Sequence, residues 1–258
     1  MRLLTVPILT LALLVPVFLA PVYLATSAQA TDLTQMTETE RTAFDAEVRA
    51  YLLANPEVLI EVQQALQAKQ QQSSDARDAA VLSANHAAIY NDPASWAGGN
   101  PDGDVTVVEF MDYRCAYCRK AYAEIEDLVK TDGNIRFVLK EFPILGEDSM
   151  TSARFAISVR LLNGDDAYKQ AHDALITLRG SPDPETLTRL AADLGVDGKA
   201  VLAKMGSDAV TAIITANRLM ADTLGVSGTP TFVMGNTVIR GYLPEAEMQK
   251  IIDDQRAG

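Results

Sequence analysis

Two cysteines, Cys115 and Cys118, lie three positions apart and are the only cysteines in the chain. The apolar run from Val105 to Met111 predicts a buried strand just before them, and residues 116–130 carry apolar side chains at helical spacing. Cys115 is therefore expected at the first turn of a helix, where unsatisfied backbone N–H groups and the helix dipole favour a thiolate. Cys118 falls one turn deeper on the same face, close enough to attack a mixed disulfide that Cys115 has formed. The pair predicts thiol-disulfide exchange, with Cys115 as the nucleophile and Cys118 as the resolving thiol.

A metal site is the alternative use of a Cys-x-x-Cys pair. A structural zinc site needs further cysteine or histidine ligands, and the chain offers only His86 and His172, neither of which pairs with another ligand at short spacing. We therefore predict no metal and no other cofactor, and we interpret both histidines as ordinary polar surface residues. Soft thiolates also suit Cu(I), so loose copper binding by the reduced pair remains open as an alternative.

The elements that must position the pair follow a definite order. The strand before the pair, the helix after it and a second strand from Ile135 to Phe142 make a β-α-β unit of the parallel type. Residues 148–224 are helical throughout and predict an insertion of four or five helices. The chain then returns to strands at 231–234 and 237–240 and closes with a helix. The predicted fold class is α/β with a helical insertion.

A separate helical extension is predicted before that unit. Residues 38–54 form one amphipathic helix, and a second helix starts at Asn55-Pro56, with Asn55 as its N-cap. The apolar stripe of the two helices consists of Phe44, Val48, Tyr51, Leu52, Leu59, Val62 and Leu66. The stripe needs a partner, which is another copy of the chain or, alternatively, the rest of this chain.

Composition divides the chain into four segments. Residues 1–30 have the layout of a secretory signal peptide that ends at Ala30, with a retained membrane anchor as the alternative. Residues 31–72 form the helical extension, and residues 73–100 are rich in small, charged and turn-forming residues and predict a linker or spacer. Residues 101–258 form the compact unit that contains the cysteine pair.

The charge and cysteine content narrow the possible partners. The formal net charge of −12 at pH 7 makes nucleic acid and anionic membrane surfaces poor partners for the whole molecule, and we predict no nucleic acid partner. An exported chain with only two cysteines has no structural disulfide framework, so ordinary packing must hold its core.

The motifs around the pair resemble a known family. The run from Asp112 to Cys118 follows a Val-Val-Glu-Phe strand, and Gly228-Thr-Pro-Thr lies far downstream before another strand. In this order the motifs resemble the DsbA-like branch of the thioredoxin superfamily, and the resemblance implies a thioredoxin-like fold over residues 101–258. It also implies a cis peptide bond between Thr229 and Pro230 against the cysteine pair, where the backbone of Thr229 pairs with a bound substrate; a plain turn is the alternative.

The resemblance gives a role to one acidic residue. Glu109 lies six residues before Cys115 and matches a buried acid that, in related folds, takes the proton of the resolving thiol. Such surroundings should raise the pKa of the Glu109 carboxyl. The alternative is a glutamate at the edge of a strand that faces water.

The residues next to the pair set limits on what the resemblance implies. Arg114, Arg119 and Lys120 favour the thiolate or form a solvated face. The founding DsbA enzymes have Pro-His between the cysteines, whereas this chain has Ala116-Tyr117. Strong oxidising power is therefore not implied, and the nucleophilic thiol is expected to have a less depressed pKa than in those enzymes.

The extension resembles that of the suppressor-of-copper-sensitivity C and Com1-like group, in which it can oligomerise the chain. The resemblance implies a periplasmic thiol-disulfide oxidoreductase that forms a homo-oligomer, acts on cysteines of exported proteins and is recycled by a membrane-bound or periplasmic redox partner. The extension favours a disulfide isomerase whose Cys115 is kept reduced. A dithiol oxidase would use the same residues with the pair kept oxidised, and a copper-binding thiol protein is a further alternative.

Overall fold

The computed structural model of the chain describes residues 33–257. The predicted signal peptide, residues 1–30, lies outside the described residues. The chain divides after Val62 into two compact units, described over residues 33–62 and 63–257. Within the described residues, no helix combines the length and the apolar composition needed to cross a membrane.

The first unit is helical, as predicted. It contains a 3-10 turn at Leu33–Gln35, helix α1 at Glu38–Ala54 and the first residues of helix α2 at Glu57–Ala84. No residue of α1 is buried. The large apolar side chains exposed in this unit are those of Phe44, Val48, Tyr51, Leu53, Leu59, Ile60 and Val62.

Side chains close both ends of α1. Thr37 and Glu40 form a capping box, in which each side chain accepts a hydrogen bond from the backbone N–H of the other residue. The prediction that Asn55 caps the start of α2 is wrong. Its side-chain amide donates to the Tyr51 carbonyl at 2.9 Å, because the last carbonyls of α1 have no helical partner and compete for the amide.

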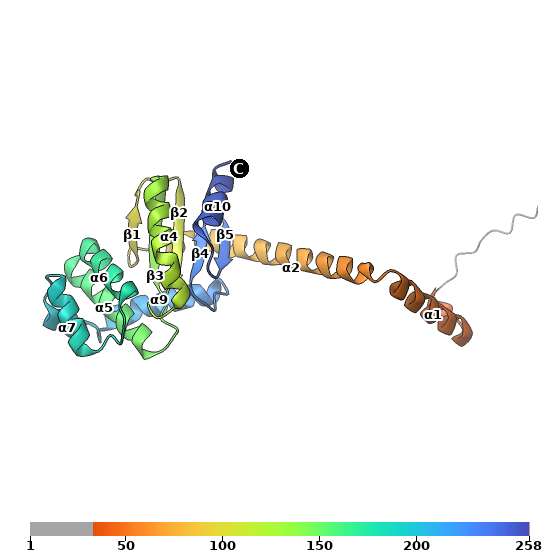
Figure 1. The fold of residues 1–258 in the computed structure, drawn as a ribbon, viewed down its shortest axis with the longest axis horizontal. Coiled ribbons are helices and arrows are strands. Elements are labelled where there is room, and N and C mark those ends of the chain that lie inside the picture. The colour runs from red at the N-terminus through yellow and green to blue at the C-terminus, as the bar shows by residue number, and fades with distance from the viewer. Residues whose placement is uncertain (1–32, 258) are drawn as a thin grey trace, which may run out of the picture. The chain divides into compact units, whose positions relative to one another are not determined.

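The second unit is built on a five-stranded sheet with the strand order β1-β3-β2-β4-β5 (Figure 1). Strands β2 and β3 are parallel, and the other neighbouring pairs are antiparallel. The strands are β1 Trp96–Gly99, β2 Val105–Met111, β3 Ile135–Glu141, β4 Thr231–Met234 and β5 Thr237–Arg240. The predicted α/β fold class and the four predicted strands are confirmed.

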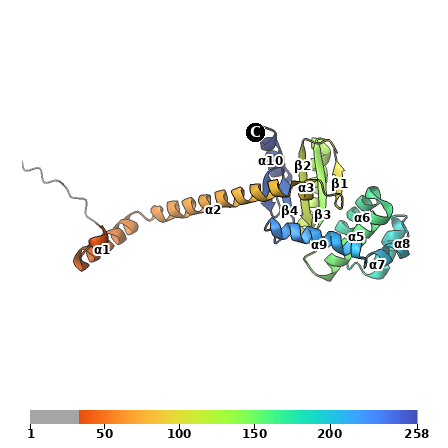
Figure 2. The same ribbon diagram turned by 180° about the vertical axis from the view of Figure 1, so that it is seen from behind.

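Helices cover both faces of this sheet (Figures 1 and 2). Apolar residues of α4, α10 and the helical insertion pack on one face, and residues of α3, α9 and the end of α2 pack on the other. Five helices, α5 to α9, form the predicted insertion. The helices are α3 His86–Tyr90, α4 Ala116–Asp132, α5 Glu147–Asn163, α6 Asp165–Thr177, α7 Pro184–Asp193, α8 Gly198–Lys204, α9 Asp208–Thr223 and α10 Glu245–Ala257.

The segment predicted as a linker, residues 73–100, is instead part of the folded second unit. Helix α2 continues through it, and its Leu82 is buried in the core. Arg240 on β5 holds the end of α2 through hydrogen bonds of 2.8 and 2.9 Å to Asp78. The low apolar content misled the sequence interpretation, because an ion pair anchors this segment in addition to apolar contacts.

Strand β1 also lies within the predicted linker, and it was not predicted from the sequence. It pairs with β3 at the edge of the sheet, and its sequence of Trp96-Ala-Gly-Gly has the composition of a turn. The Trp96 ring lies over Gly98, where an added Cβ would come within 2.2 Å of the ring, and Gly99 has a φ of +71°. These glycines are required by close packing and backbone geometry, so they do not end the strand.

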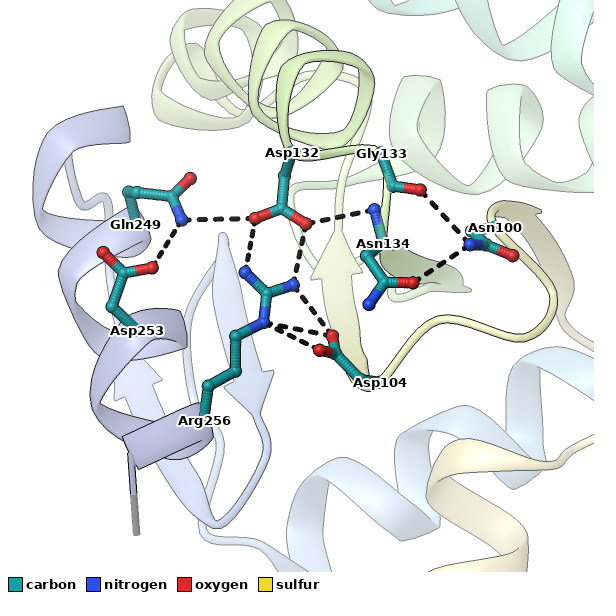
Figure 3. A network of polar contacts seen from close by, with 8 residues as sticks. All are labelled: Asn100, Asp104, Asp132, Gly133, Asn134, Gln249, Asp253 and Arg256. Carbon is teal, nitrogen blue, oxygen red and sulfur yellow. Dashed lines mark hydrogen bonds and ion pairs between the residues drawn. The ribbon is translucent and has the colours of Figure 1, made fainter.

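A polar clamp holds the last helix in place (Figure 3). The Arg256 guanidinium on α10 donates to both carboxylate oxygens of Asp132 at 2.7 and 2.8 Å, and it also donates to Asp104 at 2.8–3.1 Å. Gln249 adds a hydrogen bond to Asp132 at 3.2 Å. The clamp joins α10 to the end of α4 and to the turn before β2.

Candidate active site

The sequence places Cys115 where strand β2 has ended and helix α4 begins. Cys115 is the N-cap residue of α4, and its own N–H donates to the Asp112 carbonyl at 3.1 Å. Its side chain is largely buried, with a relative exposure of 6%. The first turn of α4 therefore points its free N–H groups at the Cys115 sulfur, as predicted.

The surroundings of Cys115 favour its thiolate. The pKa of the Cys115 thiol is lowered to about 5, first because the Cys118 side chain hydrogen-bonds to it. Burial opposes this shift, while the Thr229 side chain and the backbone N–H groups of Cys118 and Tyr117 support it. When protonated, the thiol donates to the Thr229 carbonyl at 3.1 Å, a hydrogen bond that only the neutral form can donate.

The surroundings of Cys118 favour its protonated thiol, in contrast to those of Cys115. It is buried on α4, with a relative exposure of 2%, and its pKa is raised first by burial, then by its hydrogen bond to Cys115 and by the charge of Glu109. A protonated Cys118 donates to the Cys115 thiolate and cannot itself attack a disulfide until a base removes its proton.

Glu109 is placed to be that base. It lies on β2 between Leu139 of β3 and Phe232 of β4, so it is in the middle of the sheet and not at a water-facing edge. Its relative exposure is 6%, and burial raises the pKa of its carboxyl to about 8, with a further contribution from the negative charge of Cys115. Its role in proton transfer stays a prediction.

The peptide bond between Thr229 and Pro230 is cis in the structure. The carbonyl of Thr229 reaches the Cys115 sulfur, so this loop lies directly against the cysteine pair. The assignment of Thr229 and Pro230 to substrate positioning stays a prediction.

A small cavity lies beneath the resolving thiol. Its volume of about 10 Å³ is at the lower limit for one water molecule. It is lined by Glu109, Met111, Cys118, Tyr122, Ile125, Glu126, Phe137, His172 and Ile176. The side chains of Glu109 and Cys118 therefore line the same cavity.

The sequence interpretation missed Asp112, which organises the loops around the pair. Its relative exposure is 1%, and its carboxylate accepts hydrogen bonds of 2.7–3.0 Å from the backbone N–H groups of Arg114, Ile144 and Leu145 and from the Ser149 hydroxyl. Asp112 thus joins the active-site turn to the start of the helical insertion. Its place in the motif was visible, but three of its four partners lie more than thirty residues away.

A buried polar cluster beside the pair was also missed. Tyr113 and Tyr168 donate hydrogen bonds of 2.8 and 2.7 Å to the same oxygen of Glu141, whose other oxygen is buried without a partner among the described residues. Burial raises the pKa of the Glu141 carboxyl to about 8, against the opposing effect of the two hydroxyls. A neutral carboxyl is therefore favoured at pH 7. Its proton is expected on the oxygen that accepts neither tyrosine hydroxyl.

One of the two histidines belongs to this cluster. His86 is exposed, but the prediction that His172 is a surface residue is wrong, since its relative exposure is 3%. Its Nδ1 lies 3.3 Å from the Tyr113 hydroxyl, and its ring packs near Tyr122 and Tyr168. Burial lowers the pKa of the imidazole to about 4, so it is neutral at pH 7.

The cations that flank the pair have other partners. Arg114 donates to the Gly180 carbonyl, Arg119 donates to the Tyr113 carbonyl, and the Lys120 ammonium lies 4.0 Å from the centre of the Tyr242 ring. Across residues 33–257 no group of three or more His, Cys, Asp or Glu side chains is arranged to hold a metal ion.

This fold and this cysteine pair define the class of dithiol proteins with a thioredoxin fold. Residues 91–254 match the family model described as thioredoxin, and the chain belongs to that family. Residues 40–72 match the model described as the N-terminal domain of the copper resistance protein ScsC.

Solved structures agree with this assignment. A thioredoxin-like oxidoreductase from Silicibacter pomeroyi DSS-3 is 38% identical, with a TM-score of 0.63 over 67% of this chain and 99% of that one. The thiol-disulfide exchange protein alpha-DsbA2 from Wolbachia pipientis is 26% identical, with a TM-score of 0.65 over 71% and 98%. Proteus mirabilis ScsC in a transitional conformation is 26% identical, with a TM-score of 0.62 over 87% and 98%. The chain is thus similar to thiol-disulfide exchange proteins of the DsbA and ScsC type.

Curated relatives match only in part. The Na⁺/H⁺ antiporter NhaA 1 of Salinispora arenicola (strain CNS-205) is 31% identical over 135 residues, which are 52% of this chain and 20% of the antiporter. The chain therefore spans about one fifth of the length of that relative.

Proposed function

We propose that this chain is a periplasmic disulfide isomerase that acts on cysteines of exported proteins. The observation that carries the thiol-disulfide exchange chemistry of this proposal is the pairing of a Cys115 thiol of lowered pKa with a buried, protonated Cys118. The Cys115 thiolate attacks a substrate disulfide and forms a mixed disulfide, while the backbone at Thr229 pairs with the substrate chain. A substrate thiol then displaces Cys115, which leaves a rearranged substrate disulfide and a reduced enzyme.

Cys118 resolves complexes that do not rearrange. Glu109 takes the proton of Cys118, and the resulting thiolate attacks Cys115 and releases the substrate in reduced form. A periplasmic or membrane-bound redox partner then reduces the pair again. Export depends on residues 1–30, which are proposed to be removed after Ala30.

The isomerase assignment rests on the first unit. Its large apolar side chains are exposed, and large exposed apolar patches are typical of surfaces that bind another protein. Self-association through α1 would hold several Cys115 sites on one assembly. Several sites on one assembly raise the chance that a released substrate is captured again before it diffuses away.

A dithiol oxidase is the second candidate, and the pKa of Cys115 favours it. A pKa of about 5 stabilises the thiolate and therefore the reduced form of the pair. A stabilised reduced form makes the disulfide form a stronger oxidant, which would donate its disulfide to substrates.

Refolding of scrambled ribonuclease in a glutathione buffer separates the two candidates. The chain without residues 1–30 is compared with a variant that carries Phe44→Glu and Val48→Glu, and light scattering gives the mass of each. We expect an oligomer for the unaltered chain and a monomer for the variant. The variant should reactivate scrambled ribonuclease about tenfold more slowly, but should oxidise reduced ribonuclease at the same rate.

The control variant carries Ala46→Glu and Ala50→Glu, which helical spacing places on the side of α1 away from Phe44 and Val48 and which should change neither mass nor activity. If the unaltered chain is monomeric and fails to reactivate scrambled ribonuclease while it oxidises reduced ribonuclease, the oxidase takes the place of the isomerase.

A further inference from the structure

The proton of the resolving thiol needs a path to water. In the resolving step the Cys118 S–H bond breaks and its proton goes to the Glu109 carboxylate. The electron pair of the Cys118 sulfur forms the bond to Cys115, and the substrate sulfur leaves as a thiolate with the electron pair of the old S–S bond. Glu109 is then left with one proton too many, on a side chain with only 6% relative exposure.

The residues that line the cavity beneath Cys118 differ in exposure. His172 is buried and neutral, and its Nδ1 faces the hydroxyl of the buried Tyr113, which donates to Glu141. Glu126 has a side chain that is 38% exposed, although it lines the same cavity as Glu109 and Cys118. Glu126 is therefore in contact with both the cavity and the solvent.

An ion pair keeps Glu126 at this place. The Lys169 ammonium of α6 lies 3.2 Å from a Glu126 oxygen and 2.6 Å from Asp173, and it also lies 5.8 Å from the centre of the Tyr122 ring. Helix α4 supplies Glu126 and Tyr122, and α6 supplies the two charges that face them. A partly exposed carboxylate held beside an ammonium can exchange protons with water without itself becoming buried.

We propose that Glu126 is the proton-exit residue of the site: it accepts, through the cavity, the proton that Glu109 has taken from Cys118 and passes it to the solvent. This inference rests on the proposed thiol-disulfide exchange. Glu126 acts through Glu109 and does not touch the reacting sulfurs, so it is a positioning residue of the reaction and not a catalytic one.

The charges around the cavity give the transfer a direction. The negative charges of Cys115 and Glu126 both raise the pKa of Glu109. When Cys115 enters the mixed disulfide it loses its charge, so Glu109 releases a proton and becomes a base at the moment when Cys118 must be deprotonated. The titratable or charged groups that face Glu126 are Glu109 on β2, Cys118 and Tyr122 on α4, and Lys169, His172 and Asp173 on α6.

The test follows the two chemical steps separately. The reduced full chain without residues 1–30 is mixed with excess oxidised glutathione, quenched with acid at set times and weighed by mass spectrometry. The mixed disulfide with glutathione reports the attack by Cys115, and its loss to the intramolecular disulfide reports the attack by Cys118. We expect Glu126→Gln to leave the first rate within about twofold and to slow the second at least about tenfold at pH 7.

Two further measurements distinguish proton exit from a structural effect. Formate, a small carboxylate, should restore the resolving rate of Glu126→Ala, in which the shortened side chain leaves room for it, and Glu126→Asp should retain most of the unaltered rate. The matched control is Asp127→Asn, which removes the same charge from the neighbouring exposed position of α4 and should resolve at the unaltered rate.

The outcomes are distinct. A normal resolving rate for Glu126→Gln, or a slow rate of Glu126→Ala that formate does not restore, overturns the proton-exit role. If the unaltered chain forms no mixed disulfide with glutathione, the proposed function itself fails, because the attack by Cys115 does not depend on Glu126.

Discussion

The two units of this chain treat the same residue types in opposite ways. In the first unit, phenylalanine, tyrosine, valine and leucine side chains are exposed, and no residue of α1 is buried. In the second unit the same types fill two cores, and polar groups such as Glu109, Asp112 and Glu141 are buried with them. An amphipathic pattern thus shows that a face must be covered, but not what covers it. The unit with its own core contains the cysteine pair, and our proposal assigns contact with another surface to the unit without one.

The largest difference between the two units is expected when one phenylalanine in each is replaced by alanine. Phe110 is fully buried on β2 and packs edge-on against Phe142, with ring centres 6.1 Å apart. Phe110→Ala should lower the free energy of unfolding of the second unit by about 3–5 kcal/mol. Phe44→Ala should change it by less than about 0.5 kcal/mol, because the Phe44 side chain is exposed.

Urea denaturation measured by tryptophan fluorescence gives both values. The single tryptophan, Trp96, lies in the second unit, so its signal reports on that unit alone. A large loss of stability in Phe44→Ala would show that α1 packs on the second unit and would remove the contrast between the two.

A second pair of variants compares acidic residues. Asp112 accepts four hydrogen bonds, three of them from backbone N–H groups, so the amide of Asp112→Asn would face donors on both sides. We expect a loss of about 2–3 kcal/mol of unfolding free energy. Asp45→Asn, on exposed α1, should cost less than about 0.5 kcal/mol in the same urea experiment. Equal losses would mean that Asp112 is not a structural junction.

The fold was predictable from sequence wherever apolar residues dominate. The strands β2, β3, β4 and β5 and the helical insertion follow directly from apolar runs and helical spacing. Strand β1 was not predictable, because a pair of glycines in a sequence usually indicates a turn. In the structure, Gly98 fits under the Trp96 ring and Gly99 adopts a left-handed backbone conformation. The end of α2 was mistaken for a linker because part of its anchor is the ion pair between Asp78 and Arg240, 162 residues apart.

Spacing alone predicted the candidate site only where its residues are neighbours in sequence. Cys115 and Cys118 lie on adjacent turns, so local helix geometry was enough to place them, whereas Thr229 and Pro230 were placed by the family resemblance. Glu126 and His172 reach the same cavity from two helices, and nothing in the sequence of α4 distinguishes Glu126 from a solvated residue. His172 sits at a buried position of an amphipathic helix, so its position in the apolar stripe of α6 was the one signal that could have identified it.

A third pair of variants compares arginines. Arg256 clamps α10 to Asp132 and Asp104 (Figure 3), whereas Arg49 is exposed on α1. Arg256→Met should cost about 1–2 kcal/mol of unfolding free energy, and Arg49→Met should cost almost nothing.

The clamp also has a pH dependence. Its hydrogen bonds from Arg256 lower the pKa of Asp132 to about 2, below the value of an unfolded aspartate. The contribution of this ion pair to the free energy of unfolding is therefore complete above about pH 4 and is lost as the pH falls toward 2. Urea curves at pH 7 and pH 2.5 should show a smaller difference between Arg256→Met and the unaltered chain at the lower pH. A difference that does not change with pH would contradict the role of the Asp132 carboxylate.

The smallest expected effect is a change in the pKa of the nucleophilic thiol. Thiolate absorbance at 240 nm should give a midpoint near pH 5 for Cys115 in the reduced chain. Cys118→Ala should move the midpoint upward by about one pH unit, worth about 1.4 kcal/mol, because it removes the hydrogen bond that stabilises the thiolate most. A thiol introduced into the first unit as Thr42→Cys, in a chain that also carries Cys115→Ser, should titrate near the ordinary value of about 8.5.

The sign of this effect on stability follows from the lowered pKa. Between pH 5 and the ordinary thiol value the unfolded chain binds more protons than the folded one, so the reduced chain gains stability as the pH rises. That gain is lost as the pH falls through 5, and Cys115→Ser should abolish it. If Cys115 and the introduced thiol of the first unit titrate at the same pH, the start of α4 provides no special environment, and the contrast between the two units is one of packing alone.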